Sequence, residues 1–225
     1  MWEAIRRLYA EFARRRRPRP SGVTLGGHGG APTVVLAPAN ASERSKQKAD
    51  FIAPGTLAGD TALFIQLLAE VDGDMIDVGD GAGLLLITDG RLFLDLDEVA
   101  ANGFRMGLTT LQGMGPAATE INFSGTRGGA NFYGIHMMAD RGVIRDLRFA
   151  GPFDPDVPIL MDGNGQQVIN CHFVNGGGYG VWVSGIIALI EGCVFESDAG
   201  VWLESGPSSV TIANNYFGVG AAAVA

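Results

Sequence analysis

One short pattern recurs four times between residues 143 and 217, and each copy ends in a phenylalanine. The four copies read VIRDLRF, VINCHF, LIEGCVF and TIANNYF. Their last residues, Phe149, Phe173, Phe195 and Phe217, are spaced 24, 22 and 22 residues apart. A repeat of this length holds too little apolar surface to form a core alone, so successive copies must stack on one another.

The apolar residues within each copy indicate where the chain bends. In a straight strand, residues on one face recur at even spacings, but Ile144 and Leu147 are three positions apart. Between the two columns, three residues before each phenylalanine, stand residue types that enter the left-handed backbone region at low cost. These are Asp146, Asn170, Gly192 and Asn214. We predict a strand, a one-residue corner and a second strand in each copy, with the corner side chains forming a hydrogen-bonded ladder.

A further strand precedes each copy, with paired apolar residues such as Ile135 and Met137. Strands with a sharp corner, repeating at about 22 residues, predict an all-β single-stranded solenoid, a parallel β-helix with regular coils over residues 134–217. A helix over residues 58–71, with Asp60 as its N-cap, is expected to close the N-terminal end of the tube. Earlier, irregular strands are predicted over residues 33–37, 75–78, 84–88, 92–96 and 104–112, and a polar surface segment over 39–50.

The rung pattern, seen best in Val168 to Phe173, resembles the right-handed parallel β-helix proteins of the pectate-lyase-like superfamily, whose corner asparagines stack. Residues 33–150 resemble the start of such β-helices in phage tail and other virion-associated proteins, through PANASERSKQKADFIAPG and LTTLQGMGPAATEINF. The resemblance implies a right-handed parallel β-helix domain over residues 33–225. It also implies a virion-associated structural or attachment protein of tail, baseplate or capsid-decoration type.

The N-terminal 20 residues differ from the rest in charge. They contain seven arginines and two acidic residues, a balance of +5, so the net charge of −8 leaves −13 on residues 21–225. Apolar residues three or four positions apart predict an amphipathic helix over residues 1–20 with an Arg-rich end, before a Gly-rich linker over 21–32. The apolar stripe consists of Trp2, Ile5, Leu8, Tyr9 and Phe12.

Four interpretations of this helix stay open: packing on its own domain, docking on a partner protein or another copy, lying on a membrane surface, and contacting nucleic acid. We favour docking on another virion or assembly protein, and we do not expect nucleic acid as the partner. No run of residues approaches the roughly 20 apolar residues of a membrane span, and no signal peptide is recognisable. Cys171 and Cys193 fall in one inward column and are expected to be buried thiols.

The sequence offers few catalytic candidates. Glu196 and Asp198 form the best acid pair, but carboxylates in turns are usually selected for backbone reasons. The Gly27-His28-Gly29 motif lies in the linker, ahead of every predicted coil. His136 and His172 show no metal-ligand spacing, and we expect neither a metal nor another cofactor. We therefore expect a structural role; the enzymatic alternative is a tailspike-like polysaccharide lyase or glycoside hydrolase that binds or cleaves a surface glycan.

Two tryptophans are predicted on the outside of the tube. Trp182 lies between Val181 and Val183, and alternation directs its indole outward. Trp202 occupies the same column one coil later, and His136 and Leu160 precede them in it. We predict an exposed contact surface and favour a subunit interface, because no acids or amides are predicted beside it.

A bare last coil after Phe217 would also invite a partner, and we expect a homotrimer. The predicted location is the virion, with a secreted or cell-surface protein as the alternative.

Overall fold

The computed structural model describes residues 33–72, 83–99, 103–107, 110–125, 133–138, 140–151, 157–176, 179–197, 200–204, 206, 209–218 and 223–224. The chain divides into two units between Gly30 and Ala31, and all described residues belong to the second unit. The predicted N-terminal helix with Trp2, Ile5, Leu8, Tyr9 and Phe12, the linker, and the predicted strand over 75–78 lie outside the described residues.

Residues 33–224 contain three parallel sheets, which we call A, B and C. Sheet A has the spatial strand order β18-β15-β12-β9-β6-β3-β1-β2. In chain order its strands are β1 (Thr33–Ala37), β2 (Phe51–Ile52), β3 (Leu84–Ile87), β6 (Thr110–Gln112), β9 (Val143–Arg145), β12 (Gln166–Ile169), β15 (Ile187–Glu191) and β18 (Ser209–Ala213).

Sheets B and C have six strands each, in the orders β19-β16-β13-β10-β7-β4 and β20-β17-β14-β11-β8-β5. Sheet B comprises β4 (Gly90–Asp95), β7 (Thr119–Ser124), β10 (Arg148–Ala150), β13 (His172–Gly176), β16 (Val194–Ser197) and β19 (Tyr216–Phe217). Sheet C comprises β5 (Phe104–Met106), β8 (Tyr133–Met137), β11 (Val157–Met161), β14 (Val181–Val183), β17 (Val201–Leu203) and β20 (Ala223–Val224).

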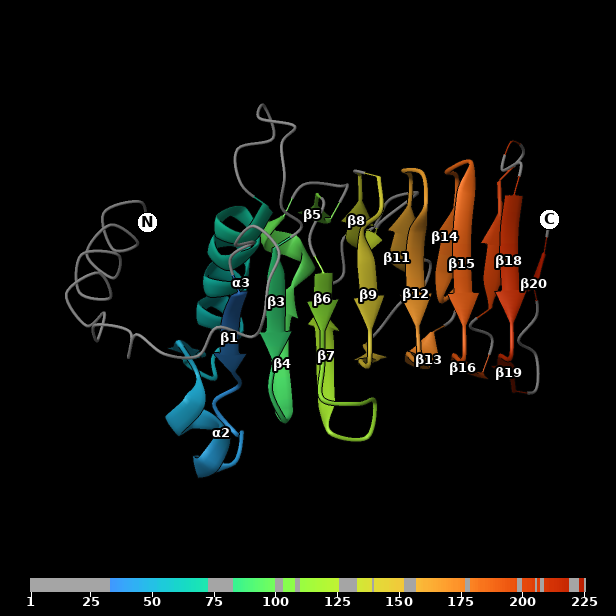
Figure 1. Cartoon of the computed structure of the whole chain (residues 1–225). Coiled ribbons are helices and arrows are strands. Elements are labelled where there is room, and N and C mark those ends of the chain that lie inside the picture. The colour runs from blue at the N-terminus through green and yellow to red at the C-terminus, as the bar shows by residue number, and fades with distance from the viewer. Residues whose placement is uncertain are drawn as a thin grey trace, which may run out of the picture. The chain divides into compact units, whose positions relative to one another are not determined.

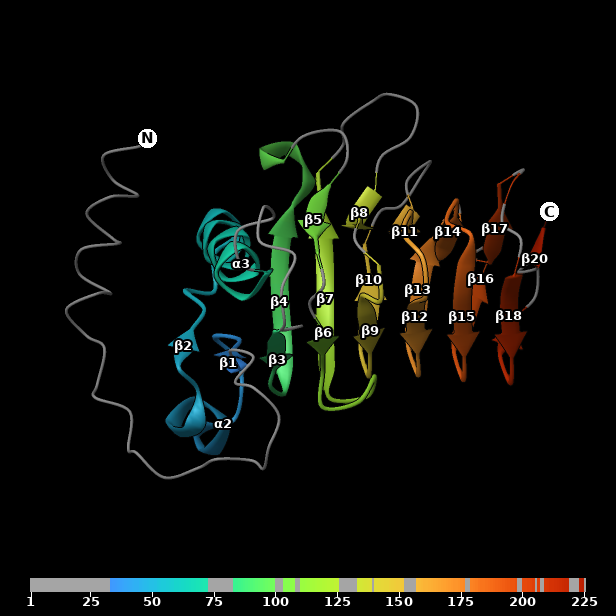
Figure 2. The same ribbon diagram turned by 45° about the horizontal axis from the view of Figure 1, so that its top comes forward.

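The chain visits the sheets in a fixed order, and each complete coil contributes one strand to each of them. Figures 1 and 2 show successive coils stacked side by side. This arrangement confirms the predicted parallel β-helix. The regular coils begin earlier than residue 134, because β3 to β7 already pair in register with later strands. The stretch 104–112, predicted as strand throughout, contains two strands that belong to different sheets, β5 in sheet C and β6 in sheet A.

A stack of phenylalanine rings fills the inside of sheet B. Phe149, Phe173 and Phe195 are in register and almost fully buried. The ring of Phe173 lies 5.4 Å from that of Phe149 and 4.9 Å from that of Phe195, with planes within 13° of parallel. Phe123 and Phe217 extend the stack at either end, at 6.2 and 5.1 Å. In-register pairing places equivalent side chains one rung apart, which is close to ring-stacking distance.

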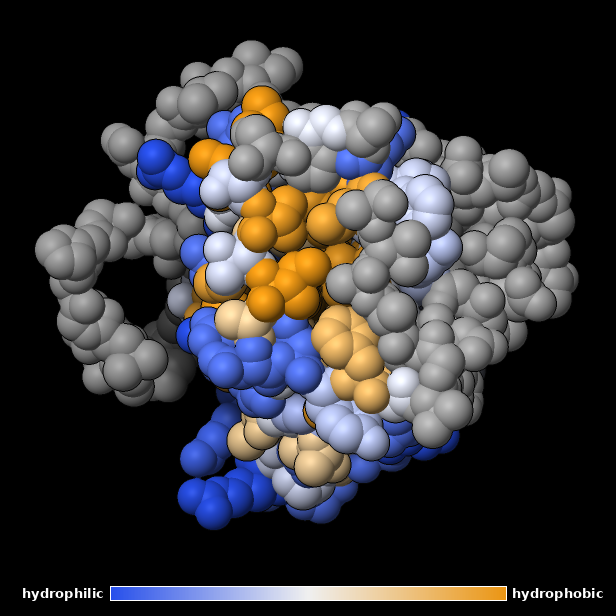
Figure 3. Space-filling model, turned by 90° about the vertical axis from the view of Figure 1, so that its right-hand side faces the viewer, coloured by the Kyte–Doolittle hydropathy of each residue, from blue (hydrophilic) through white to orange (hydrophobic). Residues whose placement is uncertain are grey.

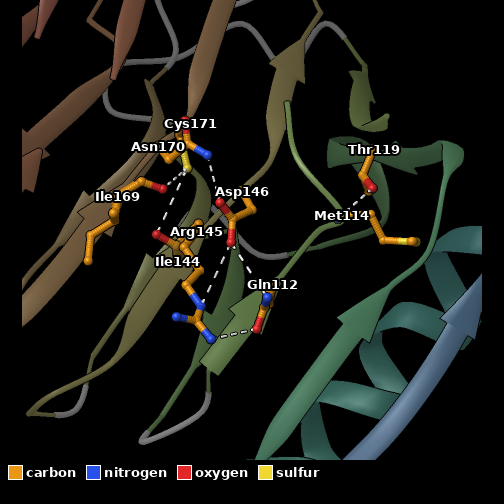
Figure 4. A network of polar contacts seen from close by, with 9 residues as sticks. All are labelled: Gln112, Met114, Thr119, Ile144, Arg145, Asp146, Ile169, Asn170 and Cys171. Carbon is orange, nitrogen blue, oxygen red and sulfur yellow. Dashed lines mark hydrogen bonds and ion pairs between the residues drawn. The ribbon is translucent and has the colours of Figure 1, made fainter. Parts of the chain in front are cut away.

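The corners between sheets A and B use left-handed backbone. Their φ angles are 61° at Asp146, 49° at Asn170, 65° at Gly192 and 57° at Asn214. The Asn170 amide donates from Nδ2 to Oδ1 of Asp146, 2.7 Å away (Figure 4). The ladder stops there, because Gly192 has no side chain; Asn214 instead donates to Glu191 at 3.2 Å. The sequence-based prediction of a ladder through all four corners is therefore wrong beyond the first two.

Helix α3 (Leu57–Asp72) covers the N-terminal end of the stack (Figure 1). Its residues Leu63, Phe64, Leu67 and Leu68 belong to the buried core, and the Phe64 ring meets the Phe104 ring edge-on at 5.3 Å. The helix begins before Asp60, so the prediction of Asp60 as N-cap is wrong. The Asp60 carboxylate is buried, and burial raises its pKa.

The edge of β4, the first strand of sheet B, explains this burial. Three side chains accept the N–H groups of alternate β4 residues: Asn40 from Arg91 at 2.8 Å, Asp60 from Phe93 at 3.2 Å, and Thr61 from Asp95 at 2.8 Å. Unpaired N–H groups at a sheet edge otherwise favour pairing with another chain. The N-terminal cap thus supplies both apolar cover and hydrogen-bond acceptors.

Two smaller elements were not predicted from the sequence. The segment 39–50 contains the short helix α2 (Glu43–Lys48), whose N-cap Ser42 accepts from the Ser45 N–H. The 3-10 helix η1 (Leu96–Glu98) follows β4, so the strand predicted to Leu96 ends at Asp95.

The C-terminal coil is less covered than the coil before it. Val183, Ile190 and Phe195 are fully buried, whereas their partners Leu203, Ile212 and Phe217 are partly buried. Figure 3, which views this end of the stack, shows hydrophobic side chains at the centre of the face. Each rung buries the previous one, so the last described rung is packed from one side.

Candidate functional site

A column of large side chains runs along the outer face of sheet C. Pairing places Arg105, His136, Leu160, Trp182 and Trp202 in register on five successive strands. Their strand neighbours, such as Val181 and Val183, are fully buried on the inner face. Alternation along each strand therefore directs this column away from the core.

The two tryptophans lie in an aromatic cluster. The Trp182 and Trp202 rings are 6.0 Å apart and tilted by 52°. Tyr133 packs edge-on against Trp182 at 5.9 Å, and Tyr179 packs against Trp202 at 4.9 Å. His136 lies 6.1 Å from the Tyr133 ring. We call these five residues, Tyr133, His136, Tyr179, Trp182 and Trp202, the aromatic ridge.

Exposure along the column is lower than the sequence suggests. Both tryptophans are half-buried, and His136 and Leu160 are each only 6% exposed. The column thus faces outward, but it is less exposed than the predicted contact surface. The tyrosines cover part of the indole surface, because Tyr133 packs edge-on against Trp182 and Tyr179 packs against Trp202.

A polar row borders the ridge on the other side. Backbone hydrogen bonds place Asp162, Ser184 and Glu204 at equivalent positions in three successive coils. Ser184 Oγ donates to Asp162 Oδ1 at 2.7 Å, and Trp182 Nε1 donates to Glu204 Oε2 at 3.4 Å. The prediction that no acids accompany the tryptophans is therefore wrong. Each member stands two residues after a member of the column, so the same alternation that located the tryptophans could have located this row.

His136 joins the ridge to the polar row. Its Nε2 lies 3.2 Å from Asp162 Oδ2. Burial lowers the pKa of this histidine, and the positive charge of Arg105 lowers it further. The hydrogen bond to Asp162 and the charge of that carboxylate act in the opposite direction and raise the pKa. The neutral imidazole is thus favoured, and in that form Nε2–H donates to the carboxylate.

The Ser184, Asp162 and His136 side chains do not form a nucleophilic triad. In a triad, histidine lies between serine and acid and removes the serine proton. Here Asp162 lies between the other two and accepts from both. Ser184 is consequently a hydrogen-bonding group in this arrangement, with no imidazole base beside its hydroxyl.

The other candidate residues lie elsewhere. Glu196, of the suggested acid pair, is on β16 in sheet B, 3.0 Å from His172 Nε2; Asp198 lies outside the described residues. Cys171 and Cys193 are buried free thiols, and burial raises the pKa of Cys171 well above its usual value. Within the described ranges, no group of three or more His, Cys, Asp or Glu residues could hold a metal ion, and no helix is both long and apolar enough to cross a membrane.

Comparison with known proteins bears on the coils that carry the tryptophans. Residues 157–224 match the family model described as the right handed beta helix region. These coils are therefore similar to those of right-handed β-helix proteins. The matched segment contains Leu160, Trp182 and Trp202, together with the polar row Asp162, Ser184 and Glu204. No match was found among curated proteins or among solved structures.

Proposed function

We propose that the protein is a glycan-binding β-helix that holds sugar rings on the aromatic ridge. The observation that carries the proposal is the pairing of half-buried Trp182 and Trp202 with an adjacent row of carboxylates and a hydroxyl. Aromatic faces stack on the apolar faces of sugars, while carboxylates accept hydrogen bonds from sugar hydroxyls. A small number of placed polar groups beside apolar surface is typical of ligand sites.

This proposal reverses the preference drawn from sequence for a subunit interface at the ridge. That preference depended on the lack of polar partners, and the structure places Asp162, Ser184 and Glu204 beside the indoles. We propose binding in preference to cleavage, because both carboxylates already accept hydrogen bonds from neighbouring side chains. A polysaccharide lyase or glycoside hydrolase remains the enzymatic alternative.

The test replaces both indoles. We expect Trp182→Ala with Trp202→Ala to abolish binding on a glycan array. Each aromatic ring that stacks on a sugar contributes roughly 1 kcal/mol to the binding free energy, and the double variant loses both rings. The matched control is Tyr216→Ala, which removes an exposed aromatic ring on sheet B. Light scattering on the same samples should show unchanged mass. A drop in oligomer mass with glycan binding intact would instead assign the ridge to a subunit interface.

A second candidate role is attachment to a larger assembly, of which a virion is the form suggested by the sequence resemblance. The division of the chain at Gly30 favours it, since the Arg-rich N-terminal residues belong to a unit separate from the β-helix. In this role residues 1–20 dock on a partner protein of a tail, baseplate or capsid, and the β-helix, as a homotrimer, presents its surface outward. The two roles are compatible.

Deleting residues 1–20 tests this second role. We expect the remaining chain to keep the melting temperature of the full chain within about 2 °C, because residues 31–225 form a separate unit that contains the hydrophobic core seen among the described residues. Recruitment into the assembly should be lost, as measured by co-sedimentation with virions or tail particles. A chain that no longer folds without these residues would show that they belong to the β-helix core.

A further inference from the structure

We infer that the aromatic ridge selects uncharged glycans and binds at least two consecutive sugar units along the tube axis. This inference rests on the glycan-binding function proposed above and adds the class of ligand. Two independent features carry it: the sign of the charges beside the ridge, and the relative orientation of the two indoles.

The charges beside the ridge are mainly negative. Asp162 and Glu204 lie in the polar row, and the Asp162 side chain is 51% exposed. Arg105 is the cation of the column, but it lies on β5, three rungs from Trp182. Residues 21–225 together carry a net charge of −13.

This balance disfavours acidic sugars. A uronate or sulfate placed over Trp182 would bring an anion next to two carboxylates, and the attraction of Arg105 would be screened over that distance. A neutral sugar presents hydroxyl groups instead, and these donate to carboxylates in charge-assisted hydrogen bonds. The same two acids therefore attract a neutral glycan and repel a polyanionic one.

The indole geometry sets a minimum ligand length. The Trp182 and Trp202 rings are tilted by 52°, so a single sugar ring cannot lie flat on both. Their centroids are 6.0 Å apart on adjacent coils, which are themselves separated by about 4.8 Å along the tube. Two successive sugar units can each stack on one indole if the glycan runs across the strands, along the tube axis. Tyr133 packs against Trp182 and Tyr179 packs against Trp202, which adds aromatic surface beside each indole.

Tryptophan fluorescence titration of the full chain tests this inference. The probes are maltohexaose, cellohexaose and mannohexaose as neutral chains, hexagalacturonate as the acidic chain, and the matching monosaccharides. We expect saturable quenching with a neutral hexasaccharide, at least tenfold weaker binding of its monosaccharide, and no binding of hexagalacturonate at 0.15 M salt. Asp162→Asn, which keeps the side-chain shape, should weaken the neutral glycan about tenfold, because a hydrogen bond to a charged acceptor is lost.

The outcomes separate the inference from the function on which it rests. Binding of hexagalacturonate that disappears in the Trp182→Ala, Trp202→Ala variant would overturn the neutral class while leaving glycan binding intact. Equal affinity for the monosaccharide and the hexasaccharide would overturn the two-unit geometry. If neither these probes nor an array of neutral and acidic glycans shows binding that depends on the two tryptophans, the proposed function itself fails, and this inference with it.

Discussion

Replacing Phe173 by alanine is expected to lower the free energy of unfolding by about 3–5 kcal/mol. Phe173 is only 1% exposed, and its ring is stacked between the rings of Phe149 and Phe195. The substitution therefore leaves a cavity lined on two sides by aromatic rings that in-register strands hold in place. At about 2–4 °C per kcal/mol for a domain of this size, the melting temperature should fall by roughly 10 °C.

The matched control for this prediction is Phe217→Ala in the same stack. Phe217 contacts Phe195 at 5.1 Å but is only partly buried, because it lies in the last coil of the stack. We expect its removal to cost about half as much, or less, in chemical denaturation followed by circular dichroism. Equal losses for the two variants would contradict the conclusion that each rung is stabilised by the rung above it.

The second large effect is expected at the corner, from Asn170→Val. Asn170 has a φ of 49°, and its amide donates to Asp146 at 2.7 Å. A β-branched residue is strained in left-handed backbone and cannot make the hydrogen bond, so we expect a loss of about 2 kcal/mol. Asn170→Gly loses the hydrogen bond but removes the strain, and it should cost about 1 kcal/mol or less.

Thr211→Val is the control for the corner variants. Thr211 is an exposed residue of β18, where extended backbone suits a β-branched side chain, so the change should stay within about 0.5 kcal/mol. Thermal melts of the three variants should therefore rank Asn170→Val as the least stable. The same melting temperature for Asn170→Val and Asn170→Gly would show that a β-branched residue is not strained at this corner.

These two effects arise from features that are local in the sequence. The three-residue spacing of Ile144 and Leu147 already indicates the corner, because it breaks the period of two at Asp146, a residue type that enters left-handed backbone at low cost. Repetition of that spacing then requires stacking, and stacking places Phe149 on Phe173 in register. The parallel β-helix and its inner columns could therefore be predicted from the residues alone.

The burial and the polar contacts of the candidate site could not be predicted in this way, because they depend on contacts between coils. The outward direction of Trp182 follows from alternation, but its burial depends on Tyr133, which lies 49 residues earlier. Tyr133 is on β8 and Trp182 on β14, so the two rings meet only when three coils are stacked. Similarly, the Asp162 carboxylate meets His136 and Ser184 from the coils on either side. No single copy of the repeat contains these pairs.

At the N-terminal cap, too, the sequence predicted the element but not its polar contacts. The apolar pattern of residues 58–71 indicated a helix at the end of the tube, and α3 is found there. Why Asp60 is buried could be decided only by the tertiary structure, in which its carboxylate accepts the N–H of Phe93 from the unpaired edge of β4. The sequence by itself determined the periodic part of this protein, because side-chain alternation and corner residues act over a few positions. The tertiary structure alone decided which polar groups meet, because those contacts join residues one or more coils apart, whose lateral neighbours depend on register and loop length.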